Sequence, residues 1–143
     1  MNEAVKDFFS SLHREHLKPR GYTKTRHTFS RDMGNYTERI QFQGSAWNDS
    51  NSPWRFYINF GVEFHDLPPR TPCRDFPATH CWTRIPAVTP SGAAEYDLPQ
   101  SVPPDFAAQI AASLQHGSEH VARTLQQIRS AYESKSWPIF PSA

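Results

Sequence analysis

Two neighbouring runs in which apolar and polar residues alternate, residues 36–45 and 54–64, constrain the fold more than any other feature of the chain. Alternation with a period of two is typical of a β-strand that packs one face and leaves the other open. A polar segment, residues 48–53, separates the runs, so we expect an antiparallel pair. The row predicted to face the core consists of Tyr36, Glu38, Ile40 and Phe42 in the first run and Phe56, Ile58, Phe60 and Val62 in the second.

The opposite row is unusual because amide side chains occupy positions where valine or isoleucine would make a simpler strand. We expect this row to form a polar face away from the helical layer. Amide and guanidinium groups offer hydrogen bonds there, and Tyr57, Trp47 and Trp54 offer rigid aromatic area. An ordinary solvated face, or amides bonded to loop backbone, is the alternative interpretation. The candidate binding residues are Arg39, Gln41, Gln43, Tyr57 and Asn59, joined by Arg84 from a short strand predicted over residues 80–85.

Segments with helical periodicity precede and follow the predicted sheet in the sequence. An N-terminal helix is predicted to start at an Asn2 cap and to end near Leu17, before Pro19. Residues 23–31 form a further strand, joined to residues 36–45 by a turn at Gly34. An apolar stripe from Asp105 onward predicts a long C-terminal helix, or a helix pair split at Gly117.

The segment between the sheet and the C-terminal helix carries nine of the thirteen prolines, so residues 66–104 are predicted to be an irregular excursion. Residues 136–143 form a tail apolar enough to dock, although it could equally fray. We therefore predict one α+β domain over residues 1–143, with an antiparallel sheet of about four strands.

Composition limits the function classes. The 143 residues carry a net charge of +1, which argues against a nucleic-acid coat, although seven Lys and Arg lie between Arg14 and Arg39. The two cysteines, Cys73 and Cys81, are expected to be free thiols. The N-terminus lacks the apolar core of a signal peptide, and no run is long enough to span a membrane. We expect a cytoplasmic protein.

Catalytic patterns are weak. The string HGSEH, residues 116–120, fits the inverted zinc-peptidase pattern H-x-x-E-H. Helical spacing places His116 and His120 on one side, but the apolar stripe turns that side toward solvent, and a third ligand must come from elsewhere. Cys81 is expected to be a small buried residue rather than a thiolate. We therefore predict no catalytic residues, no metal site and no cofactor.

Short motifs stand in a fixed order along the chain: Gly21-Tyr22 before basic residues, a strand centred on Phe29, then Gln43-Gly44-Ser45 and Ile58-Asn59-Phe60-Gly61-Val62. In order and spacing they resemble the bacterial family known as domain of unknown function 4304, most closely over residues 5–64. Cys81 with Arg84, and Tyr96-Asp97-Leu98, correspond to later motifs of that family, with Tyr96 where tryptophan is usual. The resemblance implies a fold but no activity.

The leading hypothesis is a non-enzymatic binding protein, specifically an immunity protein that neutralises a toxin by occlusion. The analogy is that some small bacterial domains of this kind lie beside secreted toxins. A small-molecule-binding protein or small enzyme using Gln43, Asn59 and Arg84 is one alternative. A weak binder of nucleic acid, through the basic residues between Arg14 and Arg39, is the other. The sequence does not indicate an oligomeric state.

Overall fold

The strand pair predicted from the alternating runs forms the centre of the structure, a computed structural model that describes residues 3–45, 48, 53–71, 78–99 and 101–143. Strand β3 (Tyr36–Gly44) pairs antiparallel with β4 (Trp54–Phe64) over nine residue pairs, from Tyr36 opposite Phe64 to Gly44 opposite Phe56. The side chains of Ile40, Phe42, Ile58 and Phe60 are buried, as the pattern indicates. The predicted Asn2 cap lies outside the described residues.

Within the described residues the sheet has six strands rather than about four. The order is β1-β2-β3-β4-β5, with β6 also paired to β4, and all pairs are antiparallel. The remaining strands are β1 (Thr23–Thr25), β2 (Thr28–Asp32), β5 (Cys81–Arg84) and β6 (Tyr96–Leu98). The predicted first strand is divided because Arg26 adopts a positive φ of 54° and turns the chain back on itself. The additional β6 is only three residues long and lies in the proline-rich segment, where periodicity carries little signal.

The predicted hairpin at Gly34 is confirmed. Gly34 has a φ of 98°, which glycine adopts without steric cost, and its N–H donates to Asp32 Oδ1 at 2.8 Å. The short strand predicted over residues 80–85 is also present, as β5.

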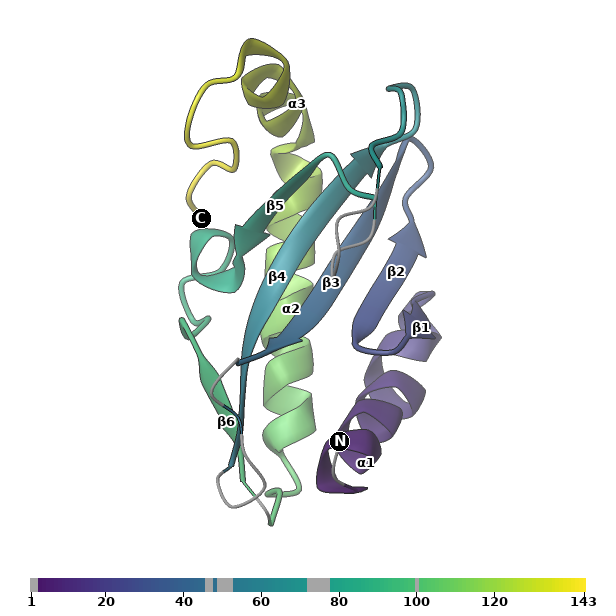
Figure 1. The fold of residues 1–143 in the computed structure, drawn as a ribbon, viewed down its shortest axis with the longest axis vertical. Coiled ribbons are helices and arrows are strands. Elements are labelled where there is room, and N and C mark those ends of the chain that lie inside the picture. The colour runs from purple at the N-terminus through teal and green to yellow at the C-terminus, as the bar shows by residue number, and fades with distance from the viewer. Residues whose placement is uncertain (1–2, 46–47, 49–52, 72–77, 100) are drawn as a thin grey trace.

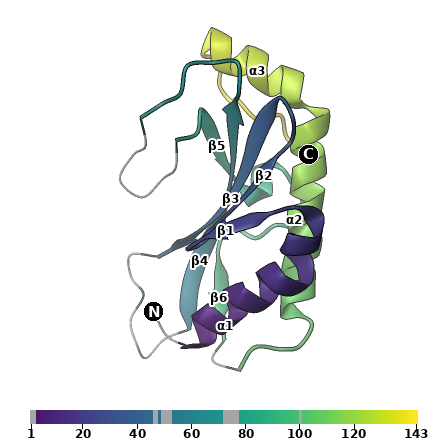
Figure 2. The same cartoon turned by 90° about the vertical axis from the view of Figure 1, so that its right-hand side faces the viewer.

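The α-helices found in the described ranges all lie on one side of the sheet (Figures 1 and 2). They are α1 (Glu3–Leu12), α2 (Phe106–Arg123) and α3 (Leu125–Ser134). The N-terminal helix continues as a π-helical turn, His13–Leu17, and a 3-10 turn, Lys18–Arg20, which contains Pro19. The predicted end near Leu17 is therefore confirmed. No helix in the described part of the chain has the length and apolar character needed to cross a membrane.

Gly117 does not split the C-terminal helix, which runs unbroken through it and is interrupted instead at Thr124. The glycine is needed for packing: a Cβ there would lie 2.5 Å from Cζ of Phe60, whose ring is buried in the core. The absence of a side chain lets α2 approach the centre of β4. The sequence reveals the glycine, but not that a phenylalanine on another element requires it.

The C-terminal tail docks on the domain. Phe140 is buried, and the N–H of Ala143 donates to the carbonyl oxygen of Ala87 at 3.2 Å. Of the two outcomes considered for residues 136–143, docking is the one observed.

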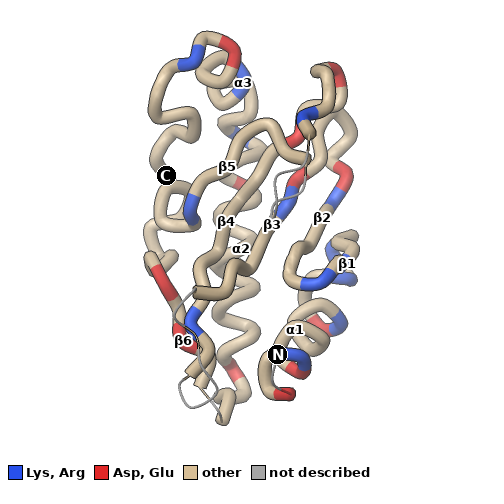
Figure 3. Tube along the Cα trace, in the orientation of Figure 1, with Lys and Arg blue, Asp and Glu red and all other residues tan. Residues whose placement is uncertain are grey.

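Charged residues of both signs are interspersed along the chain (Figure 3). The basic residues between Arg14 and Arg39 do not form one patch. Arg31 points to the core face of the sheet and lies 3.8 Å from Glu38, whereas Arg39 points to the opposite face and pairs with Glu63 at 2.7 Å. The sheet therefore divides the positive charge between its two sides.

We expect Gly117→Ala to lower the free energy of unfolding by about 1–3 kcal/mol, because overpacking against Phe60 outweighs the gain in helix propensity. Urea unfolding followed by circular dichroism would measure the change. The double variant Gly117→Ala/Phe60→Leu serves as the control, because a side chain smaller than phenylalanine at position 60 should recover part of the lost stability. A Gly117→Ala variant as stable as the parent would contradict the packing role.

Candidate binding site

In the described part of the chain, no α-helix covers the face of the sheet opposite α1, α2 and α3 (Figure 2). Strand register places the predicted polar row on this face. Strand pairing places polar side chains from four strands on this face. Gln41 lies opposite both Thr28 and Asn59, Gln43 opposite Tyr57, and Asn59 opposite Arg84. Because paired residues point to the same side of a sheet, residues distant in sequence become neighbours there.

The three amides are hydrogen-bonded to one another. Asn59 Nδ2 donates to Gln41 Oε1 at 3.0 Å and to Gln43 Oε1 at 3.1 Å. Gln41 and Asn59 retain only 6% and 5% of their accessible surface, while Gln43 is half-buried. The amides thus form the floor of a polar surface and lie outside the main core.

Arg84 covers part of that floor. Its Nη1 donates to Asn59 Oδ1 at 2.9 Å and to Gln43 Oε1 at 3.1 Å. The guanidinium carbon lies 4.3 Å from the centroid of the Tyr57 ring, a cation–π contact. Hydrogen bonds on one edge and an aromatic ring on one face hold the guanidinium group in a defined orientation.

The structure brings together the following five predicted residues, which we call the Arg84 cluster: Gln41, Gln43, Tyr57, Asn59 and Arg84. The sixth, Arg39, lies on the same face but is paired with Glu63 at 2.7 Å. It borders the cluster without joining it. Whether these residues bind a partner stays a prediction.

The aromatic residues expected to flank the polar face need correction. Trp54 points to the core face, where its ring lies 5.7 Å from Phe9 and 5.2 Å from Phe56, so it adds nothing to the polar surface. Trp47 lies outside the described residues. Among the described residues, Trp82 is the tryptophan that points to this face, with its ring packed over Gly61. Sequence reasoning missed it because the short strand β5 shows too few residues to reveal alternation.

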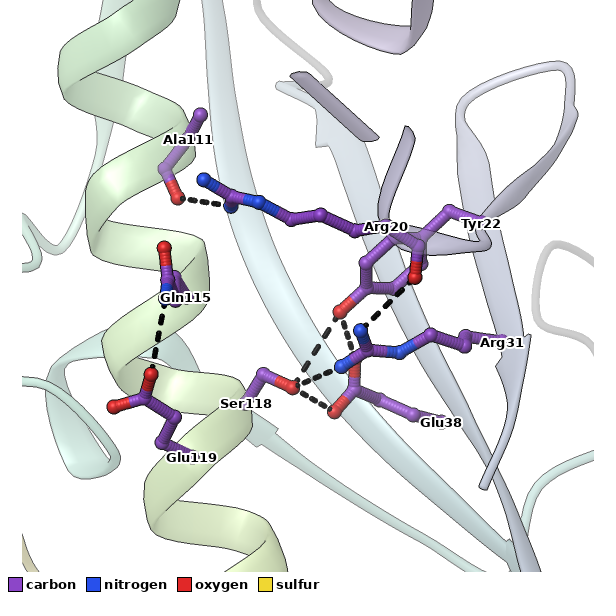
Figure 4. A network of polar contacts seen from close by, with 8 residues as sticks. All are labelled: Arg20, Tyr22, Arg31, Glu38, Ala111, Gln115, Ser118 and Glu119. Atoms are coloured by element: carbon purple, nitrogen blue, oxygen red, sulfur yellow. Dashed lines mark hydrogen bonds and ion pairs between the residues drawn. The ribbon is translucent and has the colours of Figure 1, made fainter. Parts of the chain in front are cut away.

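A second polar cluster, which the sequence did not predict, lies on the core face (Figure 4). Glu38 belongs to the apolar row of β3 and is 0% exposed. The Tyr22 hydroxyl donates to its Oε1, and Ser118 Oγ of α2 donates to its Oε2 at 2.6 Å. The signal was present in the alternation, since a carboxylate between Tyr36 and Ile40 in a core-facing row requires buried hydrogen-bond donors.

Arg31 completes this Glu38 cluster. Its Nη2 donates to Ser118 Oγ at 2.8 Å and lies 3.8 Å from Glu38 Oε1, and its Nη1 donates to the Arg20 carbonyl oxygen at 3.1 Å. The guanidinium carbon lies 4.4 Å from the Tyr22 ring centroid. Burial, followed by the Glu38 charge, raises the pKa of Tyr22, so the phenol stays protonated as a donor.

A pocket of about 330 Å³ adjoins the Glu38 cluster, lined in part by Arg20 and Arg31. Arg20 Nη1 lies 3.4 Å from the Ala111 carbonyl oxygen, whereas Arg31 bonds Ser118. Both guanidinium groups that line the pocket are therefore already hydrogen-bonded to α2. The Glu38 cluster is better suited to tying α2 to the sheet than to binding.

The expected exposure of the histidine pair is wrong for His120. His116 is exposed, but His120 is buried beneath the tail, and its Nε2 lies 2.6 Å from the Pro141 carbonyl oxygen. The docked tail, rather than the helix pattern, decides this burial. Among the described residues, no group of three potential ligands is arranged to hold a metal ion.

The interpretation of Cys81 as a small buried residue is confirmed. Its side chain is buried and carries no disulfide, and burial raises the pKa of the thiol to about 12. A thiol with so high a pKa is a poor nucleophile at neutral pH. Cys73 lies outside the described residues.

Comparison with known proteins identifies a family. The family model described as a domain of unknown function (DUF4304) matches residues 13–141, nearly the whole chain. No curated protein and no solved structure matches the chain.

We expect Glu38→Ala to lower the free energy of unfolding by about 3 kcal/mol, because Tyr22, Ser118 and Arg31 lose their shared acceptor. Glu38→Gln keeps an acceptor oxygen and should cost about 1–2 kcal/mol. Glu63→Ala is the matched control, since its ion pair is partly exposed and should matter by less than about 1 kcal/mol. Equal stability of the Ala and Gln variants in chemical denaturation would contradict the acceptor role.

Removing the Tyr36 hydroxyl should change stability at neutral pH in the direction opposite to the Glu38 substitutions. Its buried hydroxyl has no hydrogen-bond partner within the described part of the chain. Removing an unsatisfied buried polar group relieves a desolvation cost, so Tyr36→Phe should raise the free energy of unfolding by up to about 1 kcal/mol at pH 7. A fall of more than about 1 kcal/mol in the free energy of unfolding would show that the hydroxyl makes a stabilising hydrogen bond.

Tyr36→Phe should also change how the free energy of unfolding depends on pH in alkaline solution. Burial, followed by the Glu38 charge, raises the pKa of Tyr36 to about 12, whereas an unfolded tyrosine titrates near pH 10. Between about pH 10 and pH 12 this tyrosine is ionised in the unfolded state but still protonated in the folded state, so the unfolded state binds fewer protons. Because of Tyr36, the free energy of unfolding therefore falls by about 1.4 kcal/mol per pH unit over that range, and it does not fall in this way below pH 10. Urea unfolding from pH 8 to 11 should show a shallower decline for Tyr36→Phe than for the parent.

Proposed function

The chain belongs to the DUF4304 family, and we propose that it is a protein-binding protein that docks its partner on the helix-free face of the sheet. The partner is a toxin acting in the bacterial cytoplasm, and the protein neutralises it as an immunity protein by covering its functional surface. The observation that supports this proposal is the pre-ordered Arg84 cluster on that face.

Pre-ordering favours association because it removes part of the entropic cost. Each rotamer-rich side chain immobilised at an interface costs about 0.5–1.5 kcal/mol. Arg84, Gln43 and Asn59 are already bonded to one another in the free protein. A partner would therefore meet a surface whose donors and acceptors need little rearrangement.

The chemistry of the cluster suits recognition better than catalysis. Amide groups do not titrate, and a guanidinium group stays protonated throughout the physiological range. Gln41, Gln43, Asn59 and Arg84 therefore supply hydrogen bonds without supplying a base. The Tyr57 ring adds the rigid amphipathic area that protein interfaces favour.

The strand residues that point to this face carry no excess of either charge. Side chains that point to it from the strands include three arginines and three carboxylates, namely Arg39, Arg55, Arg84, Asp32, Glu63 and Asp97. The formal charges of these six side chains cancel. An inhibitor of a basic nuclease typically gains from an acidic surface. A toxin whose functional surface is not strongly basic fits this face better.

Co-expression with the product of the neighbouring reading frame would test the proposal. We expect the two proteins to co-purify and the growth defect caused by that product to be relieved. Absence of both effects would overturn the assignment as an immunity protein. Stabilisation of the free protein by a metabolite in a thermal-shift screen, without any protein complex, would favour the small-molecule alternative.

Substitution on the helix-free face should then map the interface. Tyr57→Ala should raise the Kd of the complex by about tenfold or more, because aromatic anchors at interfaces contribute more than 1 kcal/mol. Trp137→Ala is the matched aromatic control, since this tryptophan is 84% exposed and lies in the C-terminal tail. Loss of binding in the Trp137 variant, with the Tyr57 variant unaffected, would place the interface at the tail instead. Calorimetric titration measures both Kd values, and circular dichroism confirms folding.

A further inference from the structure

We infer that Arg84 is a receptor for a single carboxylate group presented by the protein partner. This inference rests on the proposed function and names the chemical group that the Arg84 cluster recognises. It follows from which edge of the guanidinium group the sheet occupies and from the charges around it.

The sheet uses only one nitrogen of Arg84. Both hydrogen bonds to the amides come from Nη1, at 2.9 Å to Asn59 Oδ1 and 3.1 Å to Gln43 Oε1. Among the described residues, Nε and Nη2 donate to no acceptor of the protein. These two nitrogens present parallel N–H groups, the fork that binds the two oxygens of a carboxylate. The free edge of Arg84 is therefore its bidentate edge.

The Tyr57 ring fixes the plane of that fork. With the guanidinium carbon 4.3 Å from the ring centroid, one face of the group is covered. A carboxylate then approaches in the guanidinium plane, where both hydrogen bonds are straight. Arg84 itself is exposed, so an acceptor can reach it from solvent.

Arg84 is also the arginine on this face whose charge is not balanced within the described residues. Arg39 pairs with Glu63 at 2.7 Å, and Arg55 pairs with Asp97 at 3.0 Å. Arg84 is bonded instead to neutral amide oxygens. Those oxygens orient the cation but leave its positive charge available to an incoming anion.

The surrounding charges favour one carboxylate over a nucleic acid. A nucleic acid binds through several successive phosphates, each needing a nearby cation. Here the other two arginines are already paired with carboxylates, which would repel a polyanion. An Asp or Glu side chain, or a C-terminal carboxylate, brings one negative charge to the guanidinium group of Arg84.

Nuclear magnetic resonance of the free protein tests the receptor directly, with acetate as the probe. We expect acetate to shift the Nε–H signal of Arg84 saturably, at ionic strength held constant with sodium chloride, and to leave those of Arg39 and Arg55 nearly unchanged. In the Arg84→Lys variant, which keeps the charge but loses the fork, acetate should no longer shift the side-chain amide signals of Gln43 and Asn59. Equal shifts at all three arginines, or no saturation, would overturn the inference.

A second arm separates a carboxylate from a phosphate. A short single-stranded oligonucleotide is titrated under the same conditions. Little response to it, beside a clear response to acetate, supports a carboxylate on a protein. A response to the oligonucleotide at far lower concentration than to acetate would overturn the inference in favour of nucleic acid.

Failure of this inference can be told apart from failure of the proposed function. In the complex, Arg84→Gln should raise the Kd by about tenfold to a hundredfold, as expected for a lost charge-assisted bidentate contact. If Tyr57→Ala weakens the complex and Arg84→Gln does not, the docking face stands and the carboxylate receptor falls. Without any complex, the acetate titration still decides whether Arg84 accepts a carboxylate.

Discussion

The nine-residue pairing of β3 with β4 is the constraint on which the other features depend. Because side chains alternate between faces, a shift of one residue would move Gln41 into the core and Ile40 to the surface. The register thus creates two chemically different surfaces at once. One is an aromatic core closed by helices, and the other is a floor of amides on which Arg84 rests.

The core surface contains a buried carboxylate, Glu38, which explains how the C-terminal helix is held. A buried carboxylate is tolerated only when hydrogen-bond donors surround it. Ser118 supplies one donor from α2, and the adjacent Gly117 lets the helix come close enough to reach it by leaving room for Phe60. Two consecutive helix residues therefore combine close packing with a polar tie, and together they fix where α2 crosses the sheet.

The alternation predicted the sheet well because its physical cause is local. Each strand residue must point to one side or the other, so the rows containing Ile40 and Gln41 could be assigned without tertiary information. Burial of His120 and the ion pair of Arg39 were not predictable in this way. The first depends on a tail that returns from 21 residues later in the chain, and the second on a carboxylate 24 residues away. Likewise Glu38 was assigned to the correct row, but its partners come from β2, α2 and the segment before β1.

Three arginines illustrate how the environment of a side chain, rather than its type, decides what it can do. Arg31 donates hydrogen bonds to Ser118 and to a backbone carbonyl oxygen, and its positive charge lies beside the buried Glu38 carboxylate. Arg39 is paired with Glu63 on the surface, which leaves little net attraction for a partner. Arg84 alone of these three is bonded to neutral acceptors, which orient a cation without cancelling it. The amides that replace valine or isoleucine in β3 and β4 therefore have a physical purpose, because aliphatic side chains at those positions could not hold Arg84 in place.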